Sequence, residues 1–402
     1  MIINSYSEEE IIFIISQKES TDLAWVEITN KYNKKFDKNK NYQSIKKCYG
    51  RYKNYFNKDD NYLEVLRKSH NTRRRNTSTA RENRVILDQW QKRNDLIETI
   101  QDTVKSISLS KYKIPKYYKK SKCKKNMTLE LLFSDVHYGK KIDGIEGNQV
   151  NHEIIRQRVK RIAKSVVKEI HRESKNFNVE RLIISMIGDV IENADFHGKE
   201  STKSCEFSTA RQVQEAINSI FLDLLAPIAQ TGIKIDILCV TGNHDRISKD
   251  KTYLKPGEDN LTYIIYKTLD LLCKQSGLKN IKFNISSGLF AHTEVYGNLL
   301  FIEHGDELGG INRNTMLMQL NKRQGQINKV INFYRIGHWH EPVQYGQGKI
   351  MVNGSVPGQD GYAESKGFWS EAIQMLNYYV ETEKRSTCFF RSFPIYLQEQ
   401  KQ

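Results

Sequence analysis

From residue 127 onwards the chain alternates short apolar runs with longer segments in which apolar residues recur every three to four positions. Five of the apolar runs have the length and the β-branched content of buried strands. They are Leu129–Phe133, Leu182–Ile187, Ile233–Val240, Leu299–Ile302 and Phe333–Ile336. The periodic segments, at about 151 to 174, 207 to 229 and 260 to 275, are typical of helices. This alternation predicts an α/β domain over residues 127–402.

The first 56 residues show three short helical patterns instead. Ser7 and Glu10 have the spacing of a capping box in front of the apolar run Ile11–Ile15, so the first helix is expected to begin there. The second pattern lies between residues 23 and 32, and the third, between residues 42 and 52, is rich in Tyr, Lys and Arg. Three such helices resemble a helix-turn-helix or Myb-like module, and a small helical bundle with a solvated basic face is the alternative. The core of residues 1–56 is expected to contain Trp25, Ile28 and Tyr49.

A polar and basic segment, residues 57–126, is predicted to link the two domains. It contains one helical pattern, Ala80–Ile107, and then the stretch Lys111–Lys125 with eight lysines, three tyrosines and a proline, which is typical of a tether. Lysines interleaved with tyrosines can follow phosphates while the rings stack on bases. The linker is therefore a second candidate for contact with nucleic acid.

Charge is distributed unevenly along the chain. The sequence has 63 Lys and Arg against 47 Asp and Glu, a net charge of +16, and residues 1–128 hold 29 of the basic and 15 of the acidic side chains. A basic module joined to a nearly neutral domain predicts a polyanionic partner, with nucleic acid ahead of an anionic membrane surface. The residues expected to contact nucleic acid are Lys46, Lys47, Arg51, Arg73, Arg74 and Arg75.

The N-terminal residues lack the basic region and the small-residue cleavage site of a signal peptide. The apolar runs also stay well short of the roughly 18 residues needed to span a bilayer. We therefore expect a cytoplasmic protein with no membrane insertion. The six cysteines are scattered and form no C-x-x-C pair, which argues against a disulfide scaffold and against a zinc ribbon.

Each of the five predicted strands runs directly into a short polar motif. In chain order the motifs are Ser-Asp-Val-His at 134–137, Gly-Asp-Val-Ile-Glu at 188–192, Gly-Asn-His-Asp at 242–245, His-Gly at 304–305 and Gly-His-Trp-His at 337–340. Ligand-binding loops of α/β sheets lie beyond the carboxyl ends of the strands, so these motifs are expected to meet. They contain five of the ten histidines, beside carboxylates and one Asn, and such donors suit hard or borderline divalent metal ions.

The order of these motifs resembles that of the calcineurin-like metallophosphoesterase superfamily, over residues 127 to about 356. The resemblance implies a β-sandwich flanked by helices, with α/β/β/α layers, and a centre of two divalent metal ions. It gives the first ion the ligands Asp135, His137 and His340. It gives the second ion the ligands Asn243, His304 and His338. Asp189 would bridge the two ions.

The same resemblance assigns chemistry to the ligands and their neighbours. Two cations about 3.5 to 4 Å apart clamp a phosphoryl group and activate the attacking water. Manganese is the expected metal, and iron, zinc and magnesium fit the same donors. His244 is expected to be the general acid that protonates the leaving oxygen, and Glu192, three residues after Asp189, is expected to orient His244.

Departures from the family pattern bear on the substrate. Protein phosphatases of this superfamily carry Arg-Gly where this chain has Asn193-Ala194, which argues against a phosphoprotein substrate. The first motif, read with the Tyr-Gly that follows it, looks more like the superfamily's double-strand-break repair nucleases, and this likeness implies Mn-dependent cleavage of DNA. Arg246 is expected to contact the substrate. If residues 306–331 form a basic rim rather than a surface helix, further contacts are expected from Arg313, Lys322 and Arg323.

Three functions are left open by the sequence. The first is a DNA nuclease, exo or endo, of a phage or mobile element. The second is a small-molecule phosphodiesterase or phosphatase, acting for instance on cyclic nucleotides, and the third is a DNA-binding regulator whose metallophosphoesterase fold has lost activity. An ATPase partner is not expected, because only 62 of the 402 residues follow His340 and leave little room for a capping domain. A homodimer, common in related nucleases, stays open.

Overall fold

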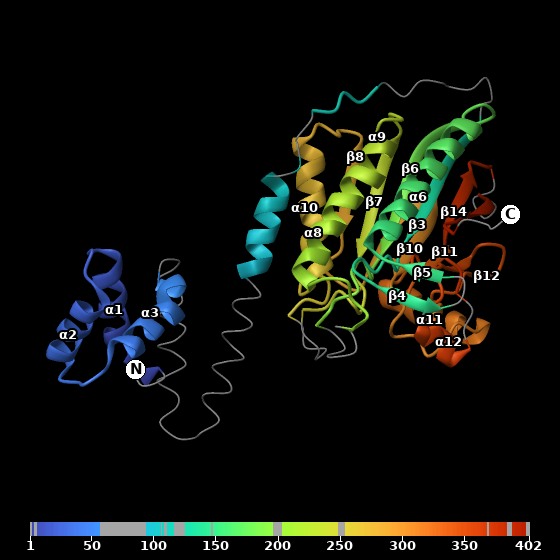
Figure 1. Ribbon diagram of the computed structural model, residues 1–402. Coiled ribbons are helices and arrows are strands. Elements are labelled where there is room, and N and C mark those ends of the chain that lie inside the picture. The colour runs from blue at the N-terminus through green and yellow to red at the C-terminus, as the bar shows by residue number, and fades with distance from the viewer. Residues whose placement is uncertain are drawn as a thin grey trace. The chain divides into compact units, whose positions relative to one another are not determined.

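The computed structural model describes residues 2–3, 6–56, 94–105, 107, 111–115, 125–145, 148–195, 203–247, 254–367, 370–383 and 388–398. They belong to two compact units, Met1–Gln91 and Lys92–Gln402 (Figure 1). Arg73, Arg74 and Arg75 lie outside the described residues. So does the first part of the helix predicted from Ala80, whereas residues 94–105 are helical.

The described part of the first unit contains three helices, preceded by a short antiparallel pair of strands, β1 (Ile2–Ile3) and β2 (Tyr6–Ser7). The helices are α1 (Glu8–Glu19), α2 (Trp25–Phe36) and α3 (Tyr42–Phe56). The predicted capping box is formed, since the Ser7 side chain accepts the N–H of Glu10 and the Glu10 side chain accepts the N–H of Ser7. The three predicted helices are thus confirmed, and the helix-turn-helix assignment stays a prediction.

The core of the first unit is apolar and aromatic. Ile28 and Tyr32 of α2 and Ile45 of α3 are completely buried. Trp25 and Tyr49 pack at the edge of this core with their ring centroids 5.1 Å apart. The predicted core residues therefore lie together, with Ile28 at the centre.

One buried carboxylate, that of Glu10, ties α1 to α2. It accepts a hydrogen bond of 2.6 Å from the Tyr32 hydroxyl and forms an ion pair of 2.5 Å with Lys38. Burial alone would raise the pKa of Glu10, but hydrogen bonds from Lys38, Ser7 and Tyr32 outweigh it and lower the pKa to about 2. The ionised form of Glu10 is therefore part of the folded unit.

The described part of the second unit contains a six-stranded sheet, a five-stranded sheet and a short antiparallel pair, β4 (Ile142–Ile145) and β5 (Asn148–Val150). The six-stranded sheet has the order β15 (Phe389–Tyr396), β14 (Ile373–Val380), β3 (Asn126–Phe133), β6 (Asn178–Ile187), β7 (Lys234–Val240) and β8 (Ile281–Ile285). The five-stranded sheet has the order β12 (Val343–Tyr345), β13 (Ile350–Val352), β11 (Phe333–Ile336), β10 (Asn298–Glu303) and β9 (Phe290–Val295). The five predicted strands are β3, β6, β7, β10 and β11, and within each sheet they pair in parallel. All five are confirmed.

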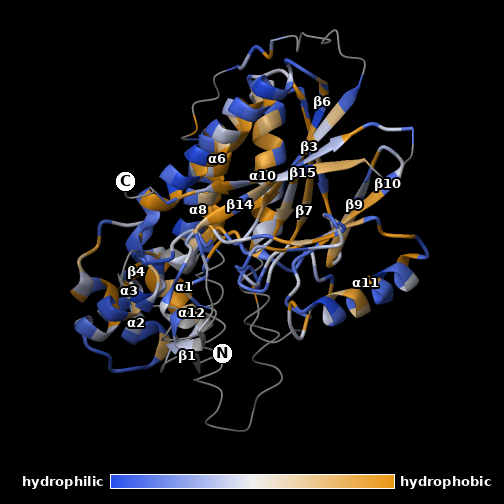
Figure 2. Cartoon of the chain, turned by 90° about the vertical axis from the view of Figure 1, so that its right-hand side faces the viewer, coloured by the Kyte–Doolittle hydropathy of each residue, from blue (hydrophilic) through white to orange (hydrophobic). Residues whose placement is uncertain are grey.

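Three groups of buried apolar side chains divide the second unit into four layers. One face of the six-stranded sheet is covered by α6 (His152–Glu173), α8 (Thr209–Ser219), α9 (Ala226–Ala229) and α10 (Leu261–Gln275). The other face packs against the five-stranded sheet, whose outer face is covered by α11 (Arg313–Ile327). Figure 2 shows strands that are mostly hydrophobic between helices with one hydrophilic side. The predicted α/β/β/α order is confirmed.

A buried polar cluster joins the two sheets. Nε of Arg335, in β11, lies 3.1 Å from Glu130 of β3, and both side chains are fully buried. Tyr379 completes a triangle, because its hydroxyl accepts a hydrogen bond from Arg335 (2.6 Å) and donates one to Glu130 (2.5 Å). Asn377 and Ser185 also donate to Glu130, each at 2.9 Å. These directional bonds fix the position of one sheet on the other.

Part of the predicted linker belongs to the second unit. Leu96, Ile100 and Val104, on the helical residues 94–105, pack against the core beneath the helical layer. The N–H of Tyr112 donates to the carbonyl of Ser276, after α10, at 2.9 Å. Among the described helices, none combines the length and the apolar character needed to cross a membrane.

Candidate metal centre

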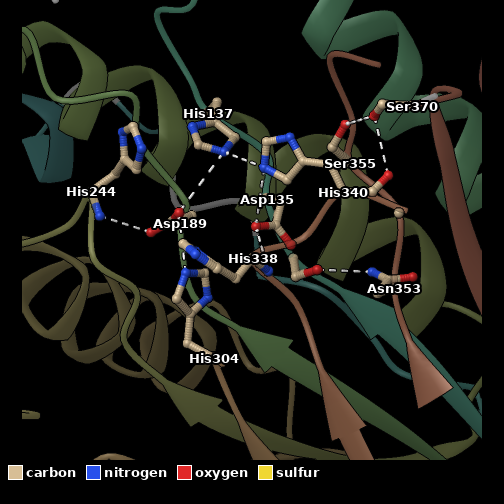
Figure 3. A network of polar contacts seen from close by, with 12 residues as sticks. Asp135, His137, Asp189, His244, His304, His338, His340, Asn353, Ser355 and Ser370 are labelled. Carbon is tan, nitrogen blue, oxygen red and sulfur yellow. Dashed lines mark hydrogen bonds and ion pairs between the residues drawn. The ribbon is translucent and has the colours of Figure 1, made fainter. Parts of the chain in front are cut away.

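The five motifs meet because each follows a parallel strand at the same end of the sheets. Three follow β3, β6 and β7 of the six-stranded sheet, and two follow β10 and β11 of the five-stranded sheet. Figure 3 shows the side chains converging from both sheets. Five of the predicted ligands have a positive φ, which turns the chain sharply directly after the strand. They are Asp135 (52°), His137 (50°), Asp189 (50°), His338 (68°) and His340 (59°).

The first group of ligand atoms comes from Asp135, His137 and His340, and these atoms lie within 4.8 Å of one another. Nε2 of His340 is 3.4 Å from Oδ1 of Asp135 and 3.2 Å from Nε2 of His137. Asp135 and His137 are buried, whereas the His340 side chain is 22% exposed. These are the three residues predicted for the first ion, and the structure brings them together.

The second group contains Asp189, His304 and His338, again within 4.8 Å. Nε2 of His304 lies 3.2 Å from Oδ2 of Asp189 and 3.0 Å from Oδ1 of Asn243, so the four residues predicted to share the second ion are neighbours. The same Oδ2 atom of Asp189 is 3.9 Å from Nε2 of His137 in the first group. Asp189 thus lies between the two groups, where a bridging ligand is expected.

The electrostatics of the buried carboxylates call for positive charge beside them. Burial would raise the pKa of Asp189, but the charges of His304 and His244 outweigh it and hold that pKa well below its ordinary value. For His304 the two effects have the opposite signs. Burial would lower its pKa, but the charges of Asp189 and Asp135 outweigh burial and raise the pKa to about 10. The pKa of His338 falls to about 4 through burial and the charge of His304. In the protein alone, a proton on His304 is therefore the balancing cation.

The donor set fits divalent metal ions. It offers two carboxylates, one amide oxygen and four imidazoles, a mixture that suits hard or borderline cations. Oδ2 of Asp135 is buried and accepts no hydrogen bond from the described residues, as expected for an oxygen that coordinates an ion. A Cβ atom at Gly337 would lie 2.6 Å from this oxygen, so the glycine keeps the position open.

Asp245 organises the backbone around Asp189. Its buried carboxylate accepts the N–H groups of Gly242 (2.8 Å), Asp189 (2.8 Å) and Val190 (3.0 Å), and so joins the loops after β6 and β7. A Cβ atom at Gly242 would lie 2.1 Å from Oδ1 of Asp189. The Gly-Asn-His-Asp motif therefore contains two residues, Gly242 and Asp245, that position the carboxylate of Asp189.

Glu192 has a different neighbour from the one predicted. Its Oε2 atom lies 2.7 Å from Nδ1 of His137 but 3.8 Å from Nδ1 of His244. Nδ1 of His244 lies instead 3.0 Å from the main-chain carbonyl of Glu192. The carboxylate is therefore placed to orient the predicted ligand His137, and the main chain is placed to orient His244. Ligand atoms of His244 also lie within 4.8 Å of His137 and Asp189, so the position of His244 suits a ligand as well as a proton donor.

A buried lysine explains where the Glu192 carboxylate points. The Lys140 ammonium lies 3.5 Å from Oε1 of Glu192 and 2.7 Å from Oδ2 of Asp360, the residue that caps α12 (Gly361–Lys366). Burial would raise the pKa of Glu192, but Lys140 and His137 lower it. Sequence reasoning did not identify Lys140 or Asp360, because a lysine 220 positions away from its partner leaves no local signal.

Asn193 is a second residue whose role sequence reasoning did not identify. Its side-chain amide donates to the carbonyls of His244 (2.8 Å) and Arg246 (3.0 Å), and its N–H donates to Gln212. Asn193 is buried and has a φ of 63°. The departure from Arg-Gly noted in the sequence thus places a clamp on the loop that carries His244.

The predicted substrate contacts differ in their surroundings. Arg246 forms an ion pair with Asp306, two residues after His304. Arg313 and Lys322 are exposed on α11, so residues 313–327 form a surface helix. Arg323 turns inward, where its Nε donates to Glu303 at 2.7 Å. The expected basic rim therefore does not include Arg323, because a buried carboxylate holds its side chain.

Comparison with known proteins gives only loose similarities. No family model matches the sequence, and no curated protein matches it. A conserved protein from Streptococcus pneumoniae, described as a predicted phosphoesterase, is 13% identical and has a TM-score of 0.27, covering 67% of this chain and 98% of its own. Zinc-bound Vps29 from Entamoeba histolytica is 9% identical with a TM-score of 0.26, and the match covers 67% of this chain and 99% of Vps29. An archaeal phosphodiesterase is 13% identical with a TM-score of 0.29, and the match covers 66% of this chain and 99% of that enzyme.

Proposed function

We propose that this chain is a metal-dependent phosphodiesterase that hydrolyses nucleic acid. The observation that carries the proposal is the position of Oδ2 of Asp189, 3.2 Å from a ligand nitrogen of His304 and 3.9 Å from one of His137. A carboxylate shared in this way keeps two cations close together, and such a pair polarises a phosphoryl group and activates water.

The residues of the chain supply orientation and a proton. His137 is held by Glu192 through Nδ1, which leaves its Nε2 directed towards the ligand group. His244 is held by the Glu192 carbonyl and is 17% exposed, so it lies at the open side of the centre. Burial lowers the pKa of His244, but Asp189 and Glu192 raise it above its ordinary value. A protonated His244 is suited to donate to the leaving oxygen.

The charge distribution supports a polymeric substrate. Residues 1–128 hold 29 basic against 15 acidic side chains, and Lys46, Lys47 and Arg51 are exposed on α3. A small-molecule enzyme has no use for such a module, whereas an enzyme acting on nucleic acid gains affinity from each phosphate contact. We extend the proposal to DNA as the substrate and Mn²⁺ as the metal on the strength of the motif resemblance.

The experiment is cleavage of end-labelled single- and double-stranded DNA with Mn²⁺, beside a small chromogenic phosphodiester. His244→Ala is expected to lose DNA cleavage, and His292→Ala, at a histidine of β9 outside the centre, is the matched control. The metal content of each protein is measured in parallel.

Each outcome separates the candidates. Cleavage of the small diester alone would reject the nucleic-acid substrate and favour a small-molecule phosphodiesterase. Bound metal without any hydrolysis would favour the inactive DNA-binding regulator. Failure to bind divalent metal would reject the whole proposal.

A further inference from the structure

We infer that the outer face of α3 is a second nucleic-acid site, at which the phosphodiester backbone lies against Gly50 and is held by Lys46, Lys47 and Arg51. It rests on the proposed function, which takes nucleic acid as the substrate, and adds a site at which binding needs neither metal nor hydrolysis. The site belongs to the first unit and shares no residue with the metal centre.

The geometry of α3 decides which residues form this face. Ile45, Cys48 and Tyr52 are buried in the core of the unit. Successive residues of a helix are about 100° apart, so positions 46, 47, 50 and 51 point away from the core, whereas Tyr49 packs at its edge. Lys46, Lys47, Gly50 and Arg51 are all exposed there.

The unit carries its charge asymmetrically. Between Lys31 and Lys53 the sequence has nine basic residues and one acidic residue, Asp37. By contrast, α1 (Glu8–Glu19) has four glutamates and one lysine. Within the described part of the unit, the ion pair that forms is that of Lys38 with Glu10. The cations of α3 are therefore available to a polyanion. The glutamates of α1 would repel the same polyanion, so α3 is the side of the unit that faces it.

Gly50 is an independent observation that points to a ligand. Glycine is a poor helix former, and it weakens a helix interior unless something requires it. Among the described residues of the unit nothing requires it, because a Cβ atom at Gly50 would meet no heavy atom within 4 Å and its φ is not in the left-handed region. A glycine on an exposed face allows another backbone to approach closely. Lys46 and Lys47 lie one turn before Gly50, so cations surround the position of closest approach.

The same residues favour nucleic acid over an anionic membrane. Helices that lie in a membrane surface bury an apolar face in the lipid. The apolar face of α3 is already committed to the core of the unit, and Lys46, Lys47, Gly50 and Arg51 offer no apolar side chain for insertion. Lysine and arginine around a bare stretch of helix backbone match phosphates instead.

The test is the affinity of the full chain for a fluorescein-labelled DNA duplex, measured by anisotropy over a series of salt concentrations with a chelator present. The combined variant Lys46→Gln, Lys47→Gln, Arg51→Gln is expected to flatten the slope of log affinity against log salt by up to about three, at roughly 0.9 per phosphate contact. Gly50→Leu is expected to weaken binding at least tenfold. Its control is Ser16→Leu, which adds the same side chain to an exposed position of α1.

Folding does not confuse the result, since leucine is a better helix former than glycine and Gly50 has open space around it. An unchanged or raised unfolding temperature with weakened binding supports the site. Wild-type affinity in Gly50→Leu, or binding to phosphatidylserine vesicles in place of DNA, overturns it. Asp189→Asn should bind the duplex like the wild type, so loss of cleavage and loss of this site are distinguishable.

Discussion

The contact between Glu192 and His137 leads to a prediction that separates two roles for one carboxylate. Glu192→Gln keeps the size of the side chain and removes its charge. If the carboxylate orients His137, as the 2.7 Å contact indicates, the variant weakens the hold on a ligand of the first ion. If it serves His244, as the sequence suggests, metal binding is unaffected and only proton donation suffers.

The expected magnitude follows from the position of Glu192. Loss of a hydrogen-bonding partner behind a metal-binding histidine typically costs about 10- to 100-fold in affinity, which corresponds to about 1.4 to 2.7 kcal/mol. We expect the lower value for Glu192→Gln, because the amide oxygen can still lie against Nδ1 of His137. Glu192→Ala, which leaves Lys140 with Asp360 as its remaining carboxylate partner, is expected to reach the upper value.

The assay is calorimetric titration of Mn²⁺ into the metal-free protein, with His244→Ala as the comparison. The affinity of one of the two ions should fall in Glu192→Gln and stay at the wild-type value in His244→Ala. Unchanged affinity for both ions in Glu192→Gln, together with an altered acid limb in the pH profile of kcat, would refute the reasoning.

Three further predictions follow from described contacts. Arg335→Met leaves the buried carboxylate of Glu130 without its cation and should cost about 3 to 5 kcal/mol in urea unfolding, whereas adding Glu130→Leu should recover much of that loss. The pKa of Glu10 is about 2 in the folded unit against 4.5 ordinarily, so the contribution of its carboxylate to stability is complete above about pH 4.5 and is lost as the pH falls towards 2. Amide exchange of α1 to α3 should show this loss of protection in the wild type, and Glu10→Gln should lack this pH dependence. Asn193→Gly keeps the positive φ but removes the clamp on His244, and should lower kcat by roughly tenfold to a hundredfold while the metal content is unchanged.

Local signals explain what could be predicted from the sequence. The runs that became β3, β6, β7, β10 and β11 were identifiable because each is a continuous apolar segment, and each ligand motif follows its strand directly. Parallel pairing then brings the motifs to one end of the sheets without further information. The capping box of α1 is equally local, since Ser7 and Glu10 are three residues apart.

Contacts between distant residues could not be predicted in this way. The partner of the Glu192 carboxylate depends on Lys140, 52 positions away, and on Asp360, which no pattern connects to either. The inward turn of Arg323 depends on which side of α11 faces Glu303, and the weak amphipathic pattern of that helix does not specify it. Packing, rather than local sequence, decides both cases.

The left-handed backbone at five of the predicted ligands has a consequence for how the protein could evolve. Each non-glycine residue in this conformation costs on the order of 1 kcal/mol, so the set stores an amount comparable with much of the net stability of a domain. Glycine at any of these positions would relieve that cost. A lineage released from selection for catalysis would therefore gain stability by losing its ligands one at a time, and mutational drift alone would erode the centre. The aspartates and histidines at these five positions are what the proposed hydrolase function leads us to expect.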